Sequence, residues 1–519
     1  MRLADYLLRL DAENYDSIAW IDRNHDGSIA KTWTWIEVQR LTVAAATFCL
    51  DHSVGKGDRV VNLGRNSLAW AILDLACSAI NAVHVPIDGR FSIAQQQHCI
   101  DLVKPKLVFS DVPSASGPIA SEWSELGQLT SLLPTDQTLQ QIALPFSSND
   151  LANILFTSGT TGVQKGVMLS HRNLHSNALA KLDAMPQSHP DRRLNFLPFS
   201  HAYARTCELT TWLISSSCME VASSMEDVFN RALFSAPTLI NGVPFFFETL
   251  EKKLVQMQAT HANIHELLGR QVRRLASGGA TLPNSIRARF AAIGLPIYQG
   301  YGLTESSPVI CSNRSGESEM GEKECEANLV EVGPPVKGMK LRIDESGRLW
   351  VSGDGVMLGY WQDTEGTKAK IVNGWLDTGD LAENVDSTNG VESSAIRILG
   401  RADDTLVLSS GYKVQPYAIE QMVLAESWVS QCILVGTKLP FPILIVHPVE
   451  TPYPPMRANE MLTRVEKILH AFPRYAIPCQ VIVTEERWTK ENGMLNFKGG
   501  LIRKKIESHY ESKTLETLH

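Results

Sequence analysis

The segment TSGTTGVQKGVMLSH, residues 157–171, gathers groups that can bind an anion. Its glycines let backbone N–H groups approach a ligand closely, its hydroxyl groups can donate hydrogen bonds, and Lys165 can neutralise negative charge. The usual phosphate loop of nucleotide hydrolases, GxxxxGK followed by Ser or Thr, does not fit, because Gly166 follows Lys165. Taken alone, the segment predicts either a phosphate-binding loop that runs into a helix or a flexible surface turn.

Four further segments combine glycine with polar residues that suit a nucleotide. They are SGGATLP at 277–283, YQGYGLTESSP at 298–308, GWLDTGDLA at 374–382 and LGRADDTLVLSSGYKVQPYAIE at 399–420. Ordinary structural roles are open to single residues within them. Glu305 can stabilise a helix N-terminus, Tyr301 can pack in a core, and Asp380 can form a turn.

In this order and spacing, the five segments resemble the acyl-adenylate-forming superfamily of acyl-CoA synthetases, luciferases and adenylation domains. The resemblance covers nearly the whole chain, and the loop and YGLTE are its specific signals, whereas SGGA alone is weak. It implies that ATP activates a carboxylic acid as an acyl-AMP, from which a thiol then displaces AMP. Such a reaction needs charge neutralisation and alignment around the triphosphate more than it needs a protein nucleophile.

The resemblance also implies roles for individual residues around ATP. The β- and γ-phosphates would be held by Thr157, Ser158, Gly159, Thr160, Thr161, Gly162 and Lys165. Thr304 would contact the α-phosphate, and Glu305 would bind Mg²⁺, a hard ion that an oxygen ligand suits. The adenine would stack on Tyr301, and the other side of the base would be lined by Gly278, Gly279 and Ala280.

The ribose and the moving domain involve the later segments. Asp380 would accept hydrogen bonds from both ribose hydroxyls, worth about 1.5–3 kcal/mol each. Arg401 would reach the ribose or phosphate, or else pair at the surface with Asp403 or Asp404, which is worth little. Asp403 matches the hinge about which the C-terminal domain would rotate between the two half-reactions. Gly411 would lie near the thiol tunnel.

Lys413 would either line the tunnel region beside Gly411 or be solvated.

The family usually carries a lysine near the C-terminus that stabilises the adenylation transition state. In ENGMLNFKGGLIRKK, residues 491–505, an ungapped alignment places Gly500 at that position, and Lys498 lies two residues earlier. Either a shifted loop lets the long side chain of Lys498 reach the site, or the lysine is absent and adenylation is slow. We expect Arg503, Lys504 and Lys505 to form a solvated helix face.

The acid and its acceptor are the least defined features. Residues 197–213, LPFSHAYARTCELTTWL, resemble the corresponding stretch of long-chain acyl-CoA synthetases. There His201 would lie at the mouth of the acyl site, although it can equally be a capped structural residue. Aromatic side chains can line an apolar pocket or belong to the core, namely Phe199, Tyr203, Phe245, Phe246 and Phe247.

We therefore expect an ATP-dependent acid–thiol ligase that uses a fatty acid, with coenzyme A as the acceptor. One alternative is an acyl-AMP ligase that loads a carrier protein, because a phosphopantetheine arm ends in the same thiol. A second alternative, which the alignment of Gly500 motivates, is a degenerate ATP-binding regulator with weak turnover.

The elements that must position these residues follow an alternating pattern. Residues 58–87 are typical of strand, helix and strand, and strand-to-loop patterns recur at 153–162, 192–203, 238–250 and 295–305. Such alternation predicts parallel sheets with helices on both faces, and ligands bind beyond the carboxyl ends of their strands. We expect a large N-terminal AMP-binding body, residues 1–400, with two parallel-sheet α/β subdomains and a β-rich one. A small mobile α/β domain, residues 401–519, would follow.

Three local patterns carry weaker signals. The DxNxDG pattern from Asp22 to Gly27 starts like a calcium loop, but Trp33 occupies the twelfth position, so we expect a hairpin turn. His261 and His265 have the i, i+4 spacing of metal ligands, although an exposed helix without a third ligand is the simpler interpretation. We expect the polar, acidic residues 313–328 to form a mobile surface loop.

The composition limits the function further. The net charge of −8 argues against a general affinity for nucleic acid or anionic membranes. The nine cysteines include no CxxC pair, which indicates buried free thiols in a reducing compartment. No segment reaches 18 uncharged apolar residues, so we expect no transmembrane segment and a cytoplasmic location.

Overall fold

The computed structural model describes residues 1–10, 12–111, 122–132, 137–158, 164–257, 261–314, 332–384, 395–449, 458–489, 491–495 and 500–516. The chain forms two compact units. Unit 1 comprises Met1–Leu282, Arg287–Leu341 and Val351–Leu376, and unit 2 comprises Pro283–Ile286, Arg342–Trp350 and Asp377–His519. The boundary after residue 400 that the sequence indicates stays a prediction.

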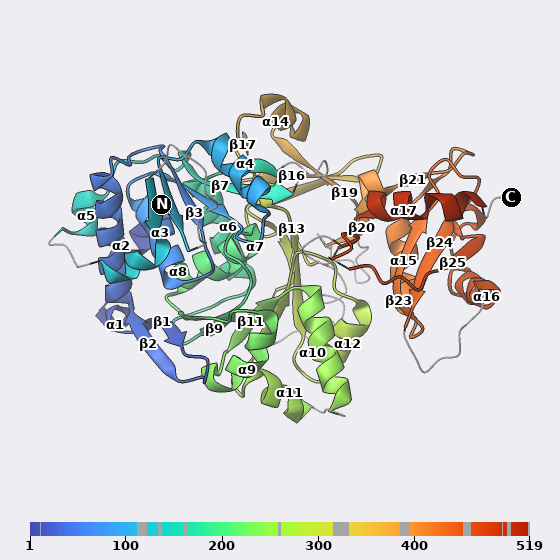
Figure 1. Ribbon diagram of the computed structural model, residues 1–519, viewed down its shortest axis with the longest axis horizontal. Helices are drawn as coiled ribbons and strands as arrows, with labels where there is room; N and C mark the ends of the chain where they lie inside the picture. The colour runs from blue at the N-terminus through green and yellow to red at the C-terminus, as the bar shows by residue number, and fades with distance from the viewer. Residues whose placement is uncertain are drawn as a thin grey trace, which may run out of the picture. The chain divides into compact units, whose positions relative to one another are not determined.

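Unit 1 contains a seven-stranded sheet in the order β17-β8-β7-β4-β3-β5-β6. Its strands are β3 (Arg59–Leu63), β4 (Val83–Ile87), β5 (Leu107–Ser110), β6 (Glu122–Glu125), β7 (Leu151–Ser158), β8 (Gln164–Ser170) and β17 (Gly359–Tyr360). The strands β3 to β7 pair in parallel, whereas β8 is antiparallel to β7 and the edge strand β17 is antiparallel to β8. The helices α2 (Trp35–Asp51) and α3 (Leu68–Ala79) lie side by side next to this sheet (Figure 1).

Unit 1 also contains an eight-stranded sheet in the order β14-β13-β12-β11-β9-β10-β1-β2. Its strands are β1 (Ile18–Arg23), β2 (Ile29–Thr34), β9 (Arg192–Asn195), β10 (Cys218–Val221), β11 (Leu239–Gly242), β12 (Arg274–Ser277), β13 (Ile297–Gly302) and β14 (Val309–Ser312). Only the outer pairs β1/β2 and β13/β14 are antiparallel among these described strands. The two parallel-sheet subdomains predicted from the sequence are therefore confirmed.

The remaining helical segments up to residue 370 precede, connect or follow these strands. They are η1 (Leu3–Leu8), α1 (Ala12–Tyr15), α4 (Ile93–Val103), η2 (Leu126–Ser131), α5 (Leu139–Ile142), α6 (His171–Ala184), α7 (Ala202–Ala204), η3 (Arg205–Thr210), α8 (Thr211–Ser215), α9 (Met225–Ser235), α10 (Pro244–Gln256), α11 (His261–Leu268), α12 (Asn284–Ala292), η4 (Thr304–Ser306) and α14 (Thr364–Lys370). A β-rich sheet is also present, as predicted. It contains β15 (Met339–Ile343), β16 (Arg348–Gly353), β18 (Ile371–Val372), β19 (Trp375–Asn384) and β20 (Ile396–Arg401).

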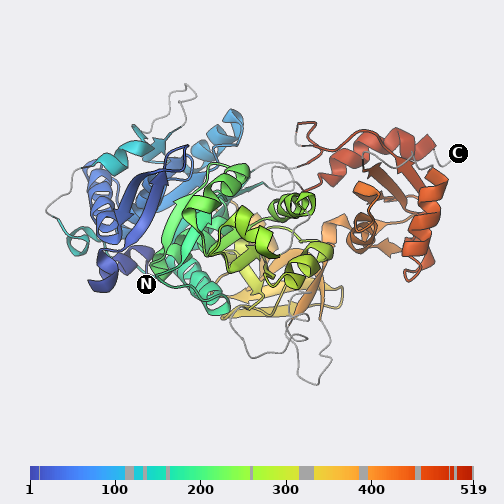
Figure 2. The same cartoon turned by 90° about the horizontal axis from the view of Figure 1, so that it is seen from below.

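Unit 2 is built on a three-stranded sheet of β23 (Val429–Val435), β24 (Ile443–Pro448) and β25 (Gln480–Val483). Its other elements are η5 (Ala402–Asp404), β21 (Leu406–Val407), β22 (Lys413–Val414), α15 (Pro416–Leu424), α16 (Ala458–Ile468), η6 (Arg474–Ala476) and α17 (Arg503–Glu516). Successive residues of a strand point to opposite faces of the sheet, and both faces of this sheet are covered by helices (Figure 2).

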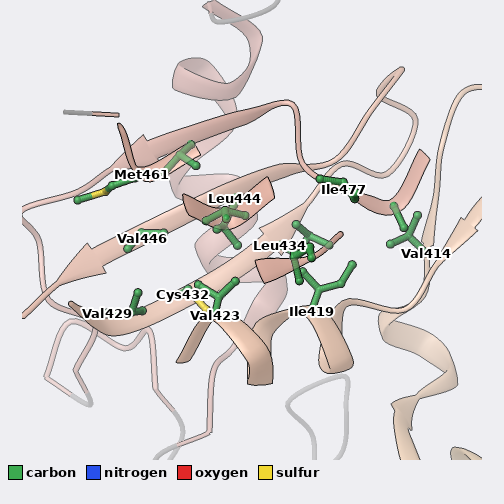
Figure 3. Packing of buried hydrophobic residues seen from close by; sticks show 14 of the residues in the cluster. Val414, Ile419, Val423, Val429, Cys432, Leu434, Leu444, Val446, Met461 and Ile477 are labelled. Atoms are coloured by element: carbon green, nitrogen blue, oxygen red, sulfur yellow. The ribbon is translucent and has the colours of Figure 1, made fainter. Parts of the chain in front are cut away.

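The core of unit 2 follows that alternation. On one face, Cys432 and Leu434 pack with Ile419 of α15 and Met461 of α16 (Figure 3). On the other face, Ile433, Val435, Ile443 and Ile445 pack with Ile506 and Tyr510 of α17. The small C-terminal α/β fold predicted from the sequence is therefore present.

Two local predictions have different outcomes. The Asp22–Gly27 segment forms the β1/β2 hairpin as expected: Asp26 accepts hydrogen bonds from the N–H and hydroxyl of Ser28, at 2.9 and 2.6 Å. The helix expected directly after the glycine-rich loop is wrong at its start. Residues 164–170 form β8 because they pair antiparallel with β7, and α6 begins only after Ser170, which caps it.

The predictions for cysteines and membrane segments concern the whole chain. Seven of the eight cysteines in the described ranges are buried free thiols, as predicted, whereas Cys479 is exposed. Among the described residues, no helix has the length and hydropathy needed to cross a membrane. Most of the acidic segment 313–328 lies outside the described residues.

Candidate functional site

The glycine-rich segment begins at the carboxyl end of β7 and continues into β8, and these two strands pair antiparallel. Thr157 lies directly opposite Lys165 in the hairpin register, and Ser158 opposite Gln164. Gly159, Thr160, Thr161 and Gly162 lie outside the described residues. Because β7 is parallel to β4, the hairpin end projects at the edge of the sheet where ligands of α/β proteins bind.

Lys165 contacts two residues of a segment that the sequence did not single out. Its Nζ lies 2.9 Å from Oδ2 of Asp363 and 4.9 Å from the centre of the Tyr360 ring. The hydrogen bond from Lys165 and one from the backbone N–H of Gly366 lower the pKa of Asp363. Both side chains of the ion pair are about two-fifths exposed, at 40% for Lys165 and 36% for Asp363, so an incoming anion can reach the ammonium group.

Glu305 contacts Met357 and Tyr360, which lie just before Asp363 in the chain. It lies in η4, directly after β13, together with Thr304. The Tyr360 hydroxyl donates a hydrogen bond of 2.8 Å to Oε1 of Glu305, and the backbone N–H of Met357 donates one of 2.9 Å to its carbonyl oxygen. Tyr360 therefore touches both the lysine expected to bind phosphate and the carboxylate expected to bind Mg²⁺.

The sequence contains a helix-start signal in this segment, although its tertiary contacts are not evident from the sequence. Asp363 precedes Thr364 and Glu365, a common pattern for the start of a helix, and its side chain does cap α14 by accepting from Gly366 N–H. Tyr360 carries no such local signal, because its importance depends on the pairing of β17 with β8, nearly 200 residues apart.

The residues expected around adenine share one sheet edge. Gly278, Gly279 and Ala280 follow β12, and Tyr301 lies in the neighbouring strand β13. Gly278 packs against the partly buried ring of Tyr203, since a Cβ at this position would lie 2.9 Å from the ring. Gly279 has a φ of +84°, a conformation that glycine adopts without strain.

His201 has two polar partners in unit 1. Its Nε2 lies 3.0 Å from Oδ2 of Asp88 and 2.8 Å from Nη2 of Arg90. Burial disfavours the charged form of Asp88, but hydrogen bonds from His201 and Arg90 outweigh it and hold the pKa of this carboxyl well below its usual range. These contacts fix the imidazole ring next to the carboxyl end of β4.

The aromatic residues that the sequence offered as acyl-pocket lining mostly belong to the core. Phe199 is fully buried and packs against Trp20 and Trp70. Phe246 and Phe247 are also fully buried, whereas Phe245 is 56% exposed. The core interpretation therefore holds for three of the aromatic residues that the sequence offered as acyl-pocket lining.

Asp380 and Arg401 lie together in unit 2. They are directly opposite each other on β19 and β20, and Nη1 of Arg401 lies 3.1 Å from Oδ1 of Asp380. The same Nη1 donates to the carbonyl oxygen of Thr378, also at 3.1 Å. The Asp380 side chain is 10% exposed and that of Arg401 is 42% exposed. The observed partner of Arg401 is thus another residue of the predicted ribose site.

Gly411 occupies the turn between β21 and β22. Its φ is +83°, and its backbone N–H donates to the carbonyl oxygen of Leu408 at 2.9 Å. Lys413, at the start of β22, is exposed. Asp403 lies in η5, which follows β20.

The described residues on either side of the expected C-terminal lysine pair with each other. Leu495 and Leu501 form an isolated antiparallel bridge, and the N–H of Ile502 donates to the carbonyl oxygen of Met494 at 2.8 Å. Lys498 lies outside the described residues, and Gly500 immediately precedes the bridge.

The solvated helix face predicted for Arg503, Lys504 and Lys505 is wrong at Arg503. Its guanidinium donates three hydrogen bonds to the carboxylate of Glu420 and one to the carbonyl oxygen of Leu434, at 2.8–3.0 Å, because α17 packs on the sheet of unit 2. Lys504 and Lys505 are exposed, as predicted.

Within the described ranges no group of three His, Cys, Asp or Glu side chains is placed to hold a metal, and His265 Nδ1 instead lies 3.3 Å from the carbonyl oxygen of Gly269.

Comparisons with known proteins agree with this architecture. The family model described as AMP-binding enzyme matches residues 9–361, and the AMP-binding enzyme C-terminal domain matches residues 403–517. Long-chain-fatty-acid--CoA ligase FadD15 of Mycobacterium bovis is 28% identical over 466 residues, which cover 77% of this chain and 74% of that protein. Feruloyl-CoA synthase of an Amycolatopsis species is 27% identical over 414 residues, covering 78% and 81%.

Among solved structures, ATP-bound MatB from Rhodopseudomonas palustris superposes with a TM-score of 0.80. The match covers 98% of this chain and 99% of that one at 22% identity, so it establishes the fold alone. The N-terminal family model spans well over half of the 519 residues, and it contains the β7/β8 hairpin, η4 and β17. The chain belongs to the AMP-binding enzyme family.

Proposed function

We propose that this protein is an ATP-dependent acid–thiol ligase that activates a fatty acid as acyl-AMP and transfers the acyl group to coenzyme A. The observation that carries the proposal is the contact of Tyr360 with both Lys165 and Glu305. This contact brings together Lys165, which we expect to bind the phosphates, and Glu305, which we expect to bind Mg²⁺. The two residues come from separate segments and meet at the sheet edge where ligands bind in α/β proteins. Membership of the AMP-binding enzyme family supports the same reaction.

In the first half-reaction, a carboxylate oxygen of the acid attacks the α-phosphorus of ATP. The bond from that phosphorus to the bridging oxygen breaks, and pyrophosphate leaves with the electron pair. Lys165, Thr157 and the rest of the glycine-rich loop would hold the β- and γ-phosphates, and Thr304 would contact the α-phosphate. Alignment and charge neutralisation of this kind supply most of the catalysis in phosphoryl-type substitutions.

Magnesium suits the donor set around Glu305. In phosphate sites this ion is commonly bound by one or two carboxylates together with substrate phosphates, rather than by a cage of protein ligands. Glu305 provides one carboxylate, which the Tyr360 hydroxyl orients at 2.8 Å. When bound, Mg²⁺ would neutralise charge on the triphosphate.

In the second half-reaction, the thiolate sulfur of coenzyme A attacks the acyl carbonyl carbon. The bond from that carbon to the phosphate oxygen breaks, and AMP leaves. We propose that Asp380 and Arg401 bind the ribose, Tyr301 and Gly278–Ala280 bind the adenine, and Gly411 borders the path of the thiol. We further propose a hinge at Asp403 within a mobile domain of residues 401–519, and Lys498 as the lysine of the adenylation step.

A fatty acid is the first choice of substrate because residues 197–213 resemble long-chain acyl-CoA synthetases and FadD15 is a relative. An aryl acid is the second choice, favoured by the similarity to feruloyl-CoA synthase. His201 would lie at the mouth of the acyl site, held by Asp88 and Arg90. Buried free thiols support a reducing location such as the cytoplasm.

The test is pyrophosphate release with a panel of fatty and aryl acids, each with and without coenzyme A or a phosphopantetheine-loaded carrier protein. Fatty-acid-dependent release followed by a coenzyme A thioester is the expected result. Lys165→Met should abolish release, whereas Lys368→Met, a change of an exposed lysine on α14, should not. Thioester on the carrier protein alone would favour the carrier-loading ligase. Tight ATP binding without release under any condition would contradict the enzyme and favour the regulator.

A further inference from the structure

Asp363 is held close to Lys165 by the backbone as well as by its side chain. The strand β17 pairs with β8 so that Tyr360 lies opposite Val167, and the N–H of Trp361 donates to the carbonyl oxygen of Gly166 at 2.7 Å. These bonds fix the start of α14 beside the hairpin end. The carboxylate of Asp363 therefore occupies a defined position relative to the ammonium group of Lys165.

The two carboxylate oxygens of Asp363 accept hydrogen bonds from different donors. Oδ1 accepts the N–H of Gly366 at 2.8 Å and so caps α14, whereas Oδ2 binds Nζ of Lys165 at 2.9 Å. The ring of Tyr360 also faces this ammonium group, at 4.9 Å. The ion pair is partly exposed and is therefore weak, which means that a stronger anion can replace the carboxylate.

We propose that Asp363 is an internal competitor of the triphosphate for Lys165, an inference that rests on the proposed function. Without nucleotide, the lysine is paired with Asp363. When a phosphate oxygen approaches Nζ, it meets a second negative charge within hydrogen-bond distance of the same cation. The like charges repel, so phosphate binding displaces the carboxylate, and the lost ion pair subtracts from the affinity.

The competition acts on the departing product as well as on the substrate. Pyrophosphate carries the phosphates that Lys165 would hold, and its release restores the pair with Asp363. A ligand shifts such an equilibrium only by its difference in affinity for the two states. Asp363 thus weakens ATP and pyrophosphate binding by the same factor and shortens the time for which pyrophosphate stays bound.

The test is Asp363→Asn in the full-length protein, with calorimetric titration of Mg·ATP and, separately, of Mg·pyrophosphate. Asparagine keeps the helix cap and removes the charge. Because an exposed ion pair contributes only a small stabilisation, we expect both dissociation constants to fall roughly two- to fivefold. Asp363→Ser also preserves a capping oxygen and should give the same tightening, which guards against a local folding effect.

The matched control is Glu365→Gln. Glu365 lies two residues further on, is 86% exposed and pairs with Lys368, so it gives the same change of net charge without contact to Lys165. We expect this variant to alter each dissociation constant by less than about 1.5-fold, since exposed charges are screened by solvent and salt. An equal effect of Glu365→Gln and Asp363→Asn would show a general charge effect and overturn the inference.

Unchanged or weaker binding by both Asp363 variants, in a protein whose wild type binds Mg·ATP, would overturn this inference alone. A wild-type protein that binds neither Mg·ATP nor Mg·pyrophosphate would overturn the proposed function and the inference with it.

Discussion

Arg503 and Glu420 join three elements of unit 2, and breaking their ion pair should loosen that unit. Glu420 of α15 accepts from Arg503 at the start of α17 and from the backbone N–H of Leu434 in β23, the latter at 2.6 Å. The two side chains are 12% and 9% exposed. Arg503→Met leaves this shielded carboxylate without its cation, which costs about 3–5 kcal/mol for a buried pair.

Hydrogen exchange measured by mass spectrometry can localise this loss. With 1.36 kcal/mol for each factor of ten, the slowest amides of β23 and β24 should exchange roughly two to four orders of magnitude faster in Arg503→Met. Peptides from β3 and β4 of unit 1 serve as the internal reference. The double variant Glu420→Gln/Arg503→Met should recover much of the protection, because no charge is left uncompensated. Less than a tenfold change in the single variant would refute the reasoning.

Three more predictions concern unit 1. Tyr360→Phe removes only the hydroxyl that donates to Glu305, so the Mg²⁺ concentration for half-maximal ATP binding should rise about two- to tenfold with little change in melting temperature; unaltered Mg²⁺ dependence would exclude an orienting role. Burial, with a further effect of Arg2, lowers the pKa of His171 to about 4. In the unfolded chain His171 binds a proton near pH 6.5, whereas in the folded protein it stays neutral down to about pH 4. The free energy of unfolding therefore falls by about 2 kcal/mol between pH 7 and 5. His171→Gln should flatten this dependence in urea unfolding. A Cβ at Gly302 would overlap the carbonyl oxygen of Pro308, so Gly302→Ala should weaken Mg·ATP binding at least about tenfold, measured by calorimetry.

Local signals in the sequence were enough to predict much of the fold. The alternation of strands and helices predicted both parallel sheets, and Asp26-Gly27 predicted the first hairpin turn. The start of β8 was missed because GVMLS has too few residues to show whether its period is that of a strand or a helix. Pairing with β7 makes this segment a strand, and that pairing is a contact across a turn which the residues of β8 alone do not reveal.

The candidate site was predictable where glycine and polar residues cluster, and not where one side chain acts through tertiary contacts. Lys165 and Glu305 were found through such clusters, whereas Tyr360 and Asp363 were not. Arg503 shows the same limit. In a run of three basic residues at a helix start, solvent exposure is the ordinary expectation, and only the packing of α17 on its sheet turns one of them towards Glu420.

The position of β17 explains why a residue outside the recognisable motifs contacts two of them. This short strand adds to β8, which carries Lys165, and the N–H of Met357, just before it, donates to the backbone of Glu305. The backbone therefore couples the hairpin end to η4 before any side chain takes part. Tyr360 then needs only one hydroxyl to set the carboxylate of Glu305 and one ring face to receive the ammonium group of Lys165. It follows that a displacement of β17 would disturb both groups together, whereas Tyr360→Phe should affect Glu305 and leave the ring contact with Lys165 in place.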